Sequence, residues 1–193
     1  MLRRRGLARL TPNTIELHRV PAALLHARSA DHHSELDGWA GIVVRLMWAV
    51  VLPDDPTDNP PAWQNWRWLL PHVLAVTDPS RASDAVNELT LLLRHAGRYL
   101  LTLGESRAGR PLFERAYELN RNRLDGDDPR MLATATELAV MLAALGECER
   151  ARALDEDTLA RYRRLRGDDH PDTLTTAGNL AVRLAERQLC AGP

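Results

Sequence analysis

The sequence predicts an all-α protein, a solenoid of repeated helix hairpins that follows a short N-terminal β-hairpin and helix. Three observations predict this class. Apolar residues such as Leu89, Leu93 and Leu100 recur at intervals of three or four, which is the spacing of an amphipathic helix. A glycine, Gly104, ends this stretch and a second helical stretch follows it, as in a helix hairpin. The same pattern then returns at an offset of 42 residues, and such self-similarity is typical of repeat proteins.

The internal repeat needs no gap. Its first part places Leu100, Gly104 and Leu112 on Leu142, Gly146 and Leu154. In its second part, ten residues recur as identical residues 42 positions later: Asp127, Pro129, Leu132, Thr134, Ala135, Leu138, Ala139, Val140, Leu142 and Ala143. Leu180 is expected to lie in the repeat core, so that Leu180→Ala would cost about 2 to 5 kcal/mol.

The segment RGDDHPD, residues 166–172, gathers three aspartates and a histidine around a proline. Its counterpart 42 residues earlier has Asp128 where His170 stands. An Asp side chain accepts free backbone N–H groups at a helix start, and proline is tolerated there because its missing N–H would be unused. Because the motif recurs with the helix boundary, we interpret residues 168–170 as a cap and turn rather than a metal site.

The N-terminal part, residues 1–33, is expected to hold a β-hairpin and one helix. Leu10 on one side and Ile15 and Leu17 on the other flank a Thr-Pro-Asn-Thr turn, as strands of a hairpin do. Pro21 is suited to open a helix.

Residues 34–79 are expected to form a helical connector. The spacing of Trp63, Trp66 and Leu70 favours one buried helix face. The alternative is that the tryptophans, Trp68 among them, and the neighbouring Arg67 form an aromatic and basic patch that stacks nucleic-acid bases.

A metal site is also weighed at HHSELD, where His32, His33, Glu35 and Asp37 are candidate ligands. The spacing does not put both histidines on one helical face, and the segment lies where a linker meets a helix. We therefore expect no metal there.

Composition excludes several classes of enzyme. All 25 residues counted as Lys or Arg are arginine, so the chain lacks the lysine of a Walker-type phosphate loop and any lysine for Schiff-base chemistry. No Ser/His/Asp or Cys/His arrangement stands out. We expect no enzymatic activity, no cofactor and no hydrolysis of ATP by this chain.

Charge and cysteine content point to an intracellular protein. The formal net charge is -1, which gives no general attraction to nucleic acid or membranes. Cys148 and Cys190 form no CxxC pair, which favours a reducing cytoplasm. The most apolar stretch, IVVRLMWAVVL, is interrupted by Arg45 and predicts neither a signal peptide nor a membrane span.

The run LGECERARALDEDTLARYRRLRGDDHPDTLTTAGNLAVRL resembles the tetratricopeptide repeats of the kinesin light chain type, over about residues 88 to 187. The resemblance implies two full units and the first helix of a third within residues 80–193. Asp155 departs from the aromatic residue expected opposite Phe113, which argues against tight packing of the second unit. The third unit has only its first helix, Pro171 to about Gln188. The implied packing positions are Leu100, Gly104, Gly109 and Phe113, then Leu142, Gly146, Ala151 and Leu154.

GLARLTPNTIELHRVPAALLHAR, within residues 1–33, resembles the end of the winged-helix segment in bacterial NB-ARC type STAND regulators. PAWQNWRWLLPHVLAVTD resembles the connector to their repeats. The chain is therefore similar to the C-terminal arm of such a signalling regulator, without its ATPase. Whether it is a complete gene product or a separated fragment without an independent role stays open.

The resemblance implies a scaffold for protein interaction, in which the concave face of the repeats would bind a peptide or a partner protein. Arg94 and Arg98 lie one turn apart, and a pair of guanidinium groups suits a carboxylate or an acidic peptide. The negative charge of Glu137 beside them would weaken the binding of an acidic peptide. The alternative is that this face is solvated and binds no ligand. The candidate peptide-binding residues are Arg94, His95, Arg98, Thr136, Glu137, Val140, Asn179 and Val182.

Two further expectations concern the chain ends. Arg3, Arg4, Arg5 and Arg9 form a basic N-terminal wing, and the second functional hypothesis is a nucleic-acid binding regulator that holds phosphates with them. At the other end, the last helix lacks a covering partner. We expect it to fray or to pair with a second copy.

Overall fold

The computed structural model describes residues 8–10, 15–17, 39–51, 56, 59–79 and 85–190. Within these ranges the chain forms two short strands and a series of helices. The elements are β1 (Ala8–Leu10), β2 (Ile15–Leu17), α2 (Trp39–Val51), α3 (Pro60–Val76), α4 (Val86–Thr102), α5 (Ser106–Arg121), α6 (Pro129–Ala144), α7 (Cys148–Arg166) and α8 (Pro171–Cys190).

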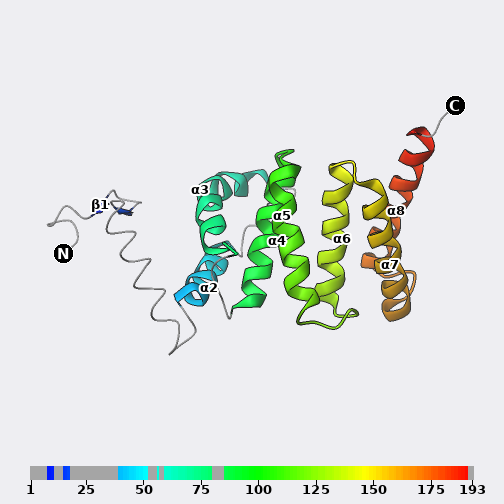
Figure 1. Ribbon diagram of the computed structural model, residues 1–193, viewed down its shortest axis with the longest axis horizontal. Helices are drawn as coiled ribbons and strands as arrows, with labels where there is room; N and C mark the ends of the chain where they lie inside the picture. The colour runs from blue at the N-terminus through cyan, green and yellow to red at the C-terminus, as the bar shows by residue number, and fades with distance from the viewer. Residues whose placement is uncertain are drawn as a thin grey trace.

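The helices follow one another along a single row, each packed on its neighbours in the chain (Figure 1). The hairpins α4–α5 and α6–α7 are stacked through contacts of α5 with α6, and α8 packs on α7 in the same way. The helices α2 and α3 both contact α4, which extends the stack in the N-terminal direction. The predicted solenoid of helix hairpins is therefore confirmed for residues 85–190.

The two strands pair antiparallel, with Ala8 opposite Leu17 and Leu10 opposite Ile15. The helix expected after Pro21 lies outside the described residues, as do Arg3, Arg4 and Arg5. Two strands of three residues are insufficient support for a winged-helix remnant, so that part of the predicted fold is not supported.

Glycine ends the first helix of each full hairpin, as predicted. Gly104 and Gly146 have φ values of 76° and 78°, in the left-handed region that glycine adopts without a steric penalty. The amide of Glu105 then donates to the carbonyl of Leu100, at 2.8 Å, and the amide of Glu147 donates to Leu142 in the same way. These bonds satisfy carbonyls that the helix end would otherwise leave free.

The core is apolar at the positions that the helical period predicts. Leu89, Leu93, Ala96 and Leu100 are at most 4% exposed, whereas Leu103 is 45% exposed because it lies past the end of α4. Trp66 of α3 is 1% exposed and packs with this cluster. Its burial, with Trp63 and Leu70 packed against the same cluster, supports the core interpretation of this helix face, whereas Trp68 is 72% exposed.

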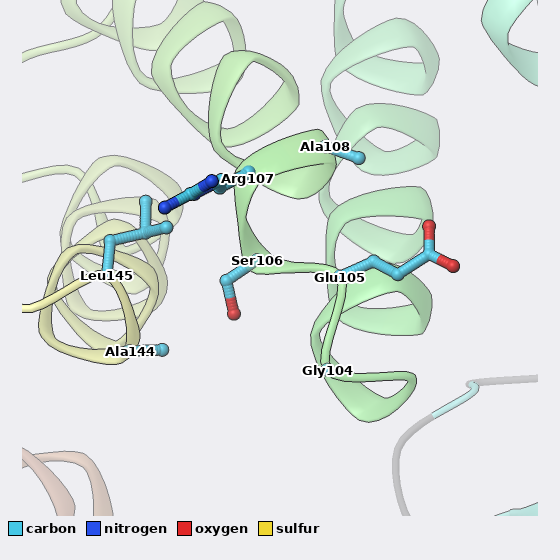
Figure 2. Close-up of a pocket in the computed structure, with 7 residues that line it drawn as sticks. All are labelled: Gly104, Glu105, Ser106, Arg107, Ala108, Ala144 and Leu145. Atoms are coloured by element: carbon cyan, nitrogen blue, oxygen red, sulfur yellow. The ribbon is translucent and has the colours of Figure 1, made fainter.

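A shallow pocket lies between the α4–α5 turn and the end of α6 at Ala144 and Leu145 (Figure 2). It has a volume of about 430 Å³ and is wide open. Arg107 points toward Leu145, while Glu105 points away (Figure 2). Because the pocket is open and holds no convergent set of polar groups, it lacks the enclosed lining of a small-molecule site.

Candidate functional site

The first helices of successive hairpins, α4, α6 and α8, contact one another in turn. We call these three helices the first-helix row. All eight candidate peptide-binding residues lie on it. The row is held by polar contacts, because α4 meets α6 through arginine and glutamate, and Thr136 Oγ1 of α6 lies 3.4 Å from Thr176 Oγ1 of α8.

Arg94, Arg98 and Glu137 form one charged cluster in this row. Arg94 Nε donates to Glu137 Oε2 at 2.7 Å, and Arg94 Nη2 donates to Oε1 at 2.8 Å. Arg98 Nε donates to the same Oε1 at 3.0 Å, and its Nη2 also pairs with that oxygen. The Arg94 contact is therefore bidentate, the strongest geometry for a guanidinium and a carboxylate.

Glu137 is charged because of these contacts. Burial acts to raise the pKa of Glu137, but the hydrogen bond and charge of Arg94, followed by the charge of Arg98, outweigh it and leave the pKa below its ordinary value. The arginine pair that the sequence offers to an acidic guest is thus engaged by a carboxylate of the chain itself.

His95 lies in an aromatic cluster between α2, α3 and α4. Its ring meets Trp48 edge-on, with centroids 5.1 Å apart, and stacks on Trp66 at 6.1 Å. Trp66 also stacks on Tyr99. His95 is only 8% exposed, so the structure places it in the packing between helices rather than at a surface.

The other candidate residues are more accessible. Thr136, Val140 and Asn179 are half-buried, and Val182 is 58% exposed. The Thr136 hydroxyl donates to the Leu132 carbonyl at 3.1 Å. These residues leave a partly open, mildly polar surface beside the charged cluster.

Tyr162 is a neighbour of this surface that sequence reasoning missed, because it comes from a second helix, α7. Burial raises the pKa of its hydroxyl and the charge of Asp172 raises it further, whereas the charges of Arg166 and Arg94 and a hydrogen bond with Thr136 act to lower it. The hydroxyl of a core tyrosine usually finds a polar partner. Sequence spacing gives no sign of this contact, since Thr136 and Tyr162 belong to different helices of one hairpin.

The segment at residues 166–172 caps a helix, as predicted. His170 Nδ1 accepts from the backbone amide of Asp172 at 3.2 Å, and Asp128 Oδ1 accepts from the amide of Arg130 at 2.8 Å at the equivalent helix start. Asp168 instead pairs with Arg163 on the surface. Among the described residues no group of three His, Cys, Asp or Glu side chains is arranged to hold a metal. The HHSELD residues lie outside the described part of the chain.

Within the described residues, no helix has the length and apolar character needed to span a membrane.

Comparison with known proteins agrees with this geometry. A family model described as tetratricopeptide repeat matches residues 131–172, which cover α6, α7 and the first residues of α8. A search of curated proteins found no match.

Solved structures share the fold. BtubC (BKLC) from P. vanneervenii superimposes with a TM-score of 0.55 at 16% identity, covering 86% of this chain. This chain spans 63% of that protein. The kinesin light chain nearly identical TPR-like repeats of Podosopora anserina give a TM-score of 0.58 at 18% identity and cover 87% of this chain and 76% of that one. Residues 131–172 thus match a tetratricopeptide repeat, and the helices share the fold of kinesin light chain-like repeat proteins.

Proposed function

We propose that this chain is a non-enzymatic interaction module whose first-helix row binds a peptide or a partner protein. Tetratricopeptide repeats generally mediate protein–protein interaction, and stacked hairpins present one extended face to a ligand. The observation that carries the proposal is the partly open surface of Thr136, Val140 and Asn179 beside the Arg94–Glu137 cluster. A role in bacterial signalling or regulation is the corresponding biological proposal.

The guanidinium pair of Arg94 and Arg98 suits a ligand with an acidic group, and the engagement of both arginines by Glu137 limits that preference. Glu137→Gln keeps the side chain's size and removes its charge. We therefore expect this variant to bind acidic peptides more tightly than the wild type, with little change for neutral peptides. Equal affinity for both peptide classes in both proteins would contradict an acidic ligand.

The binding surface itself is tested with a random-peptide library selected on the purified chain. Val140→Arg and Asn179→Arg add a long side chain to the first-helix row and should abolish binding of the selected peptides. Ala153→Arg makes the same addition at an exposed position of α7 and is the matched control. Loss of binding in Ala153→Arg alone, or no loss in either variant of the row, would show that the ligand binds elsewhere.

We also propose that α8 mediates self-association. Leu174 and Val182 are each 58% exposed and Leu184 is 41% exposed. Leu132 and Leu142, the counterparts of Leu174 and Leu184 in α6, are each only 2% exposed. Exposed apolar side chains on one helix promote association.

Light scattering over a range of concentrations tests this association. Val182→Glu should remove a concentration-dependent increase in mass, and Leu165→Glu, an exposed leucine of α7, should not. A wild-type chain that stays monomeric at all concentrations would contradict the proposal.

A further inference from the structure

The junction between α5 and α6 is apolar at its centre. Phe113 of α5 is 1% exposed and Met141 of α6 is fully buried, and both belong to one hydrophobic cluster. The cluster has no room to spare. A Cβ placed on Gly97 would lie 2.5 Å from the Phe113 ring, and one on Gly109 would lie 2.7 Å from Met141 Cε.

The next junction, between α7 and α8, replaces these two residues with charges. The residues 42 positions after Phe113 and Met141 are Asp155 and Arg183. Asp155 is fully buried, Arg183 is 5% exposed, and the Arg183 guanidinium pairs with Asp155 Oδ2. An ion pair thus occupies the place that an aromatic ring and a thioether fill one repeat earlier.

The replacement of two apolar residues by a buried ion pair does not favour stability. Removing two charges from water is costly, and well-packed apolar residues in the place of a buried pair often give equal or greater stability. In addition, Asp155 Oδ1 has no hydrogen-bond partner among the described residues, and a half-satisfied buried network is worse than an apolar one. A role in specificity accounts for the exchange better than a role in stability.

The repeat itself creates a need for specificity. Most of the residues that are buried in α6 recur as identical residues in α8, among them Thr134, Ala135 and Leu138 as Thr176, Ala177 and Leu180. Either helix would therefore fit α5 or α7 by shape. A wrong pairing, within one chain or between two copies, would bury Arg183 against Phe113, or Asp155 against Met141. Each of these leaves a charge without a counter-charge, which is strongly unfavourable.

We propose that Asp155 and Arg183 form a charge key, which selects α8 and excludes α6 as the helix that packs on α7. The key prevents the helices from pairing one repeat out of register. It also prevents α6 of one copy of this chain from taking the place of α8 on another copy.

Single charge reversals in the full chain provide the test. Asp155→Arg and Arg183→Asp each place two like charges at the junction, so in either variant alone α8 should detach. Amide exchange over residues 171–185 should then be fast, while residues 129–144 stay protected. When the two variants are mixed, each α7 meets an opposite charge on the α8 of the other chain. We expect a one-to-one heterodimer with protected α8, formed by reciprocal exchange of that helix.

The double variant D155R/R183D is the control for fit, and should regain α8 protection as a single chain. If this double variant does not regain protection, or if the mixture behaves as the sum of the two single variants, the charge key is wrong.

Substituting both charged residues by apolar ones tests the same proposal without reversed charges. D155L/R183M replaces the pair with apolar side chains of similar size and avoids a phenylalanine ring, because Ala139 and Ala151 stand where Gly97 and Gly109 make room for Phe113 and Met141 one repeat earlier. Its midpoint of thermal unfolding should equal or exceed that of the wild type. It should, however, lose specificity and give a larger exchanged-dimer fraction than the wild type after refolding at high concentration. A D155L/R183M chain that refolds with the wild-type distribution of species and wild-type protection in α8 would overturn the proposal.

Discussion

Gly97 of α4 lies directly against the ring of Phe113 of α5, and a Cβ at Gly97 would stand 2.5 Å from the ring's Cε2. Because Phe113 is 1% exposed, its ring has no free space to move into. Gly97→Ala should therefore destabilise the fold by about 1 to 3 kcal/mol through overpacking, although alanine favours a helix more than glycine.

The matched control is Gly178→Ala in α8, where an added Cβ would meet nothing within 4 Å. This variant should be stabilised by about 0.5 to 1 kcal/mol, the difference in helix propensity. Urea unfolding of both variants checks the pair of expectations. Equal effects of the two substitutions would contradict the close approach of α4 and α5.

Glu137 should make stability depend on pH. Its pKa in the folded protein is lower than its ordinary value because Arg94 and Arg98 stabilise the charged form against the effect of burial. A group with a lowered folded pKa contributes stability that is present above its unfolded pKa and is lost as pH falls through the folded pKa. Glu137→Gln should lower the free energy of unfolding by about 1 to 3 kcal/mol at neutral pH. On acidification, the stability of this variant should fall less than that of the wild type. Unfolding measured from neutral to acidic pH tests this, and parallel pH profiles for the two proteins would contradict it.

Asp128 should stabilise the start of α6. Its side chain accepts from the Arg130 guanidinium and from the Arg130 amide, and these bonds lower its pKa. Asp128→Ala should cost about 0.5 to 2 kcal/mol, whereas Asp128→Asn, which keeps an acceptor, should cost less. Thermal unfolding above and below the usual pKa range of Asp measures both. A wild-type advantage over Asp128→Ala that persists unchanged in acid would argue against the capping role.

Leu138 and Leu180 are equivalent by sequence but should differ in their contribution to stability. Leu138 is 5% exposed, whereas Leu180 is half-buried. Leu138→Ala should cost about 2 to 5 kcal/mol, and Leu180→Ala should cost clearly less because part of its side chain already contacts water. Denaturant unfolding of each variant checks this, and equal costs would mean that α8 is covered in solution.

Much of the fold follows from local sequence. Helix periodicity, the glycines that end helices and the 42-residue offset predict the hairpins, because these signals act within one helix or one turn. The helix caps follow for the same reason: the side chains of Asp128 and His170 bond to amides two residues away.

The sequence by itself therefore determined which segments are helices, where they end and that they repeat. Only the tertiary structure decided what the polar residues contact. Arg94 meets Glu137 across two helices, His95 lies among tryptophans, and Asp155 meets Arg183. These contacts join residues far apart in the chain, whose spacing along one helix says nothing about their partners on another. Burial of a charge is set by the helix that covers it, and so it is decided by how the helices stack.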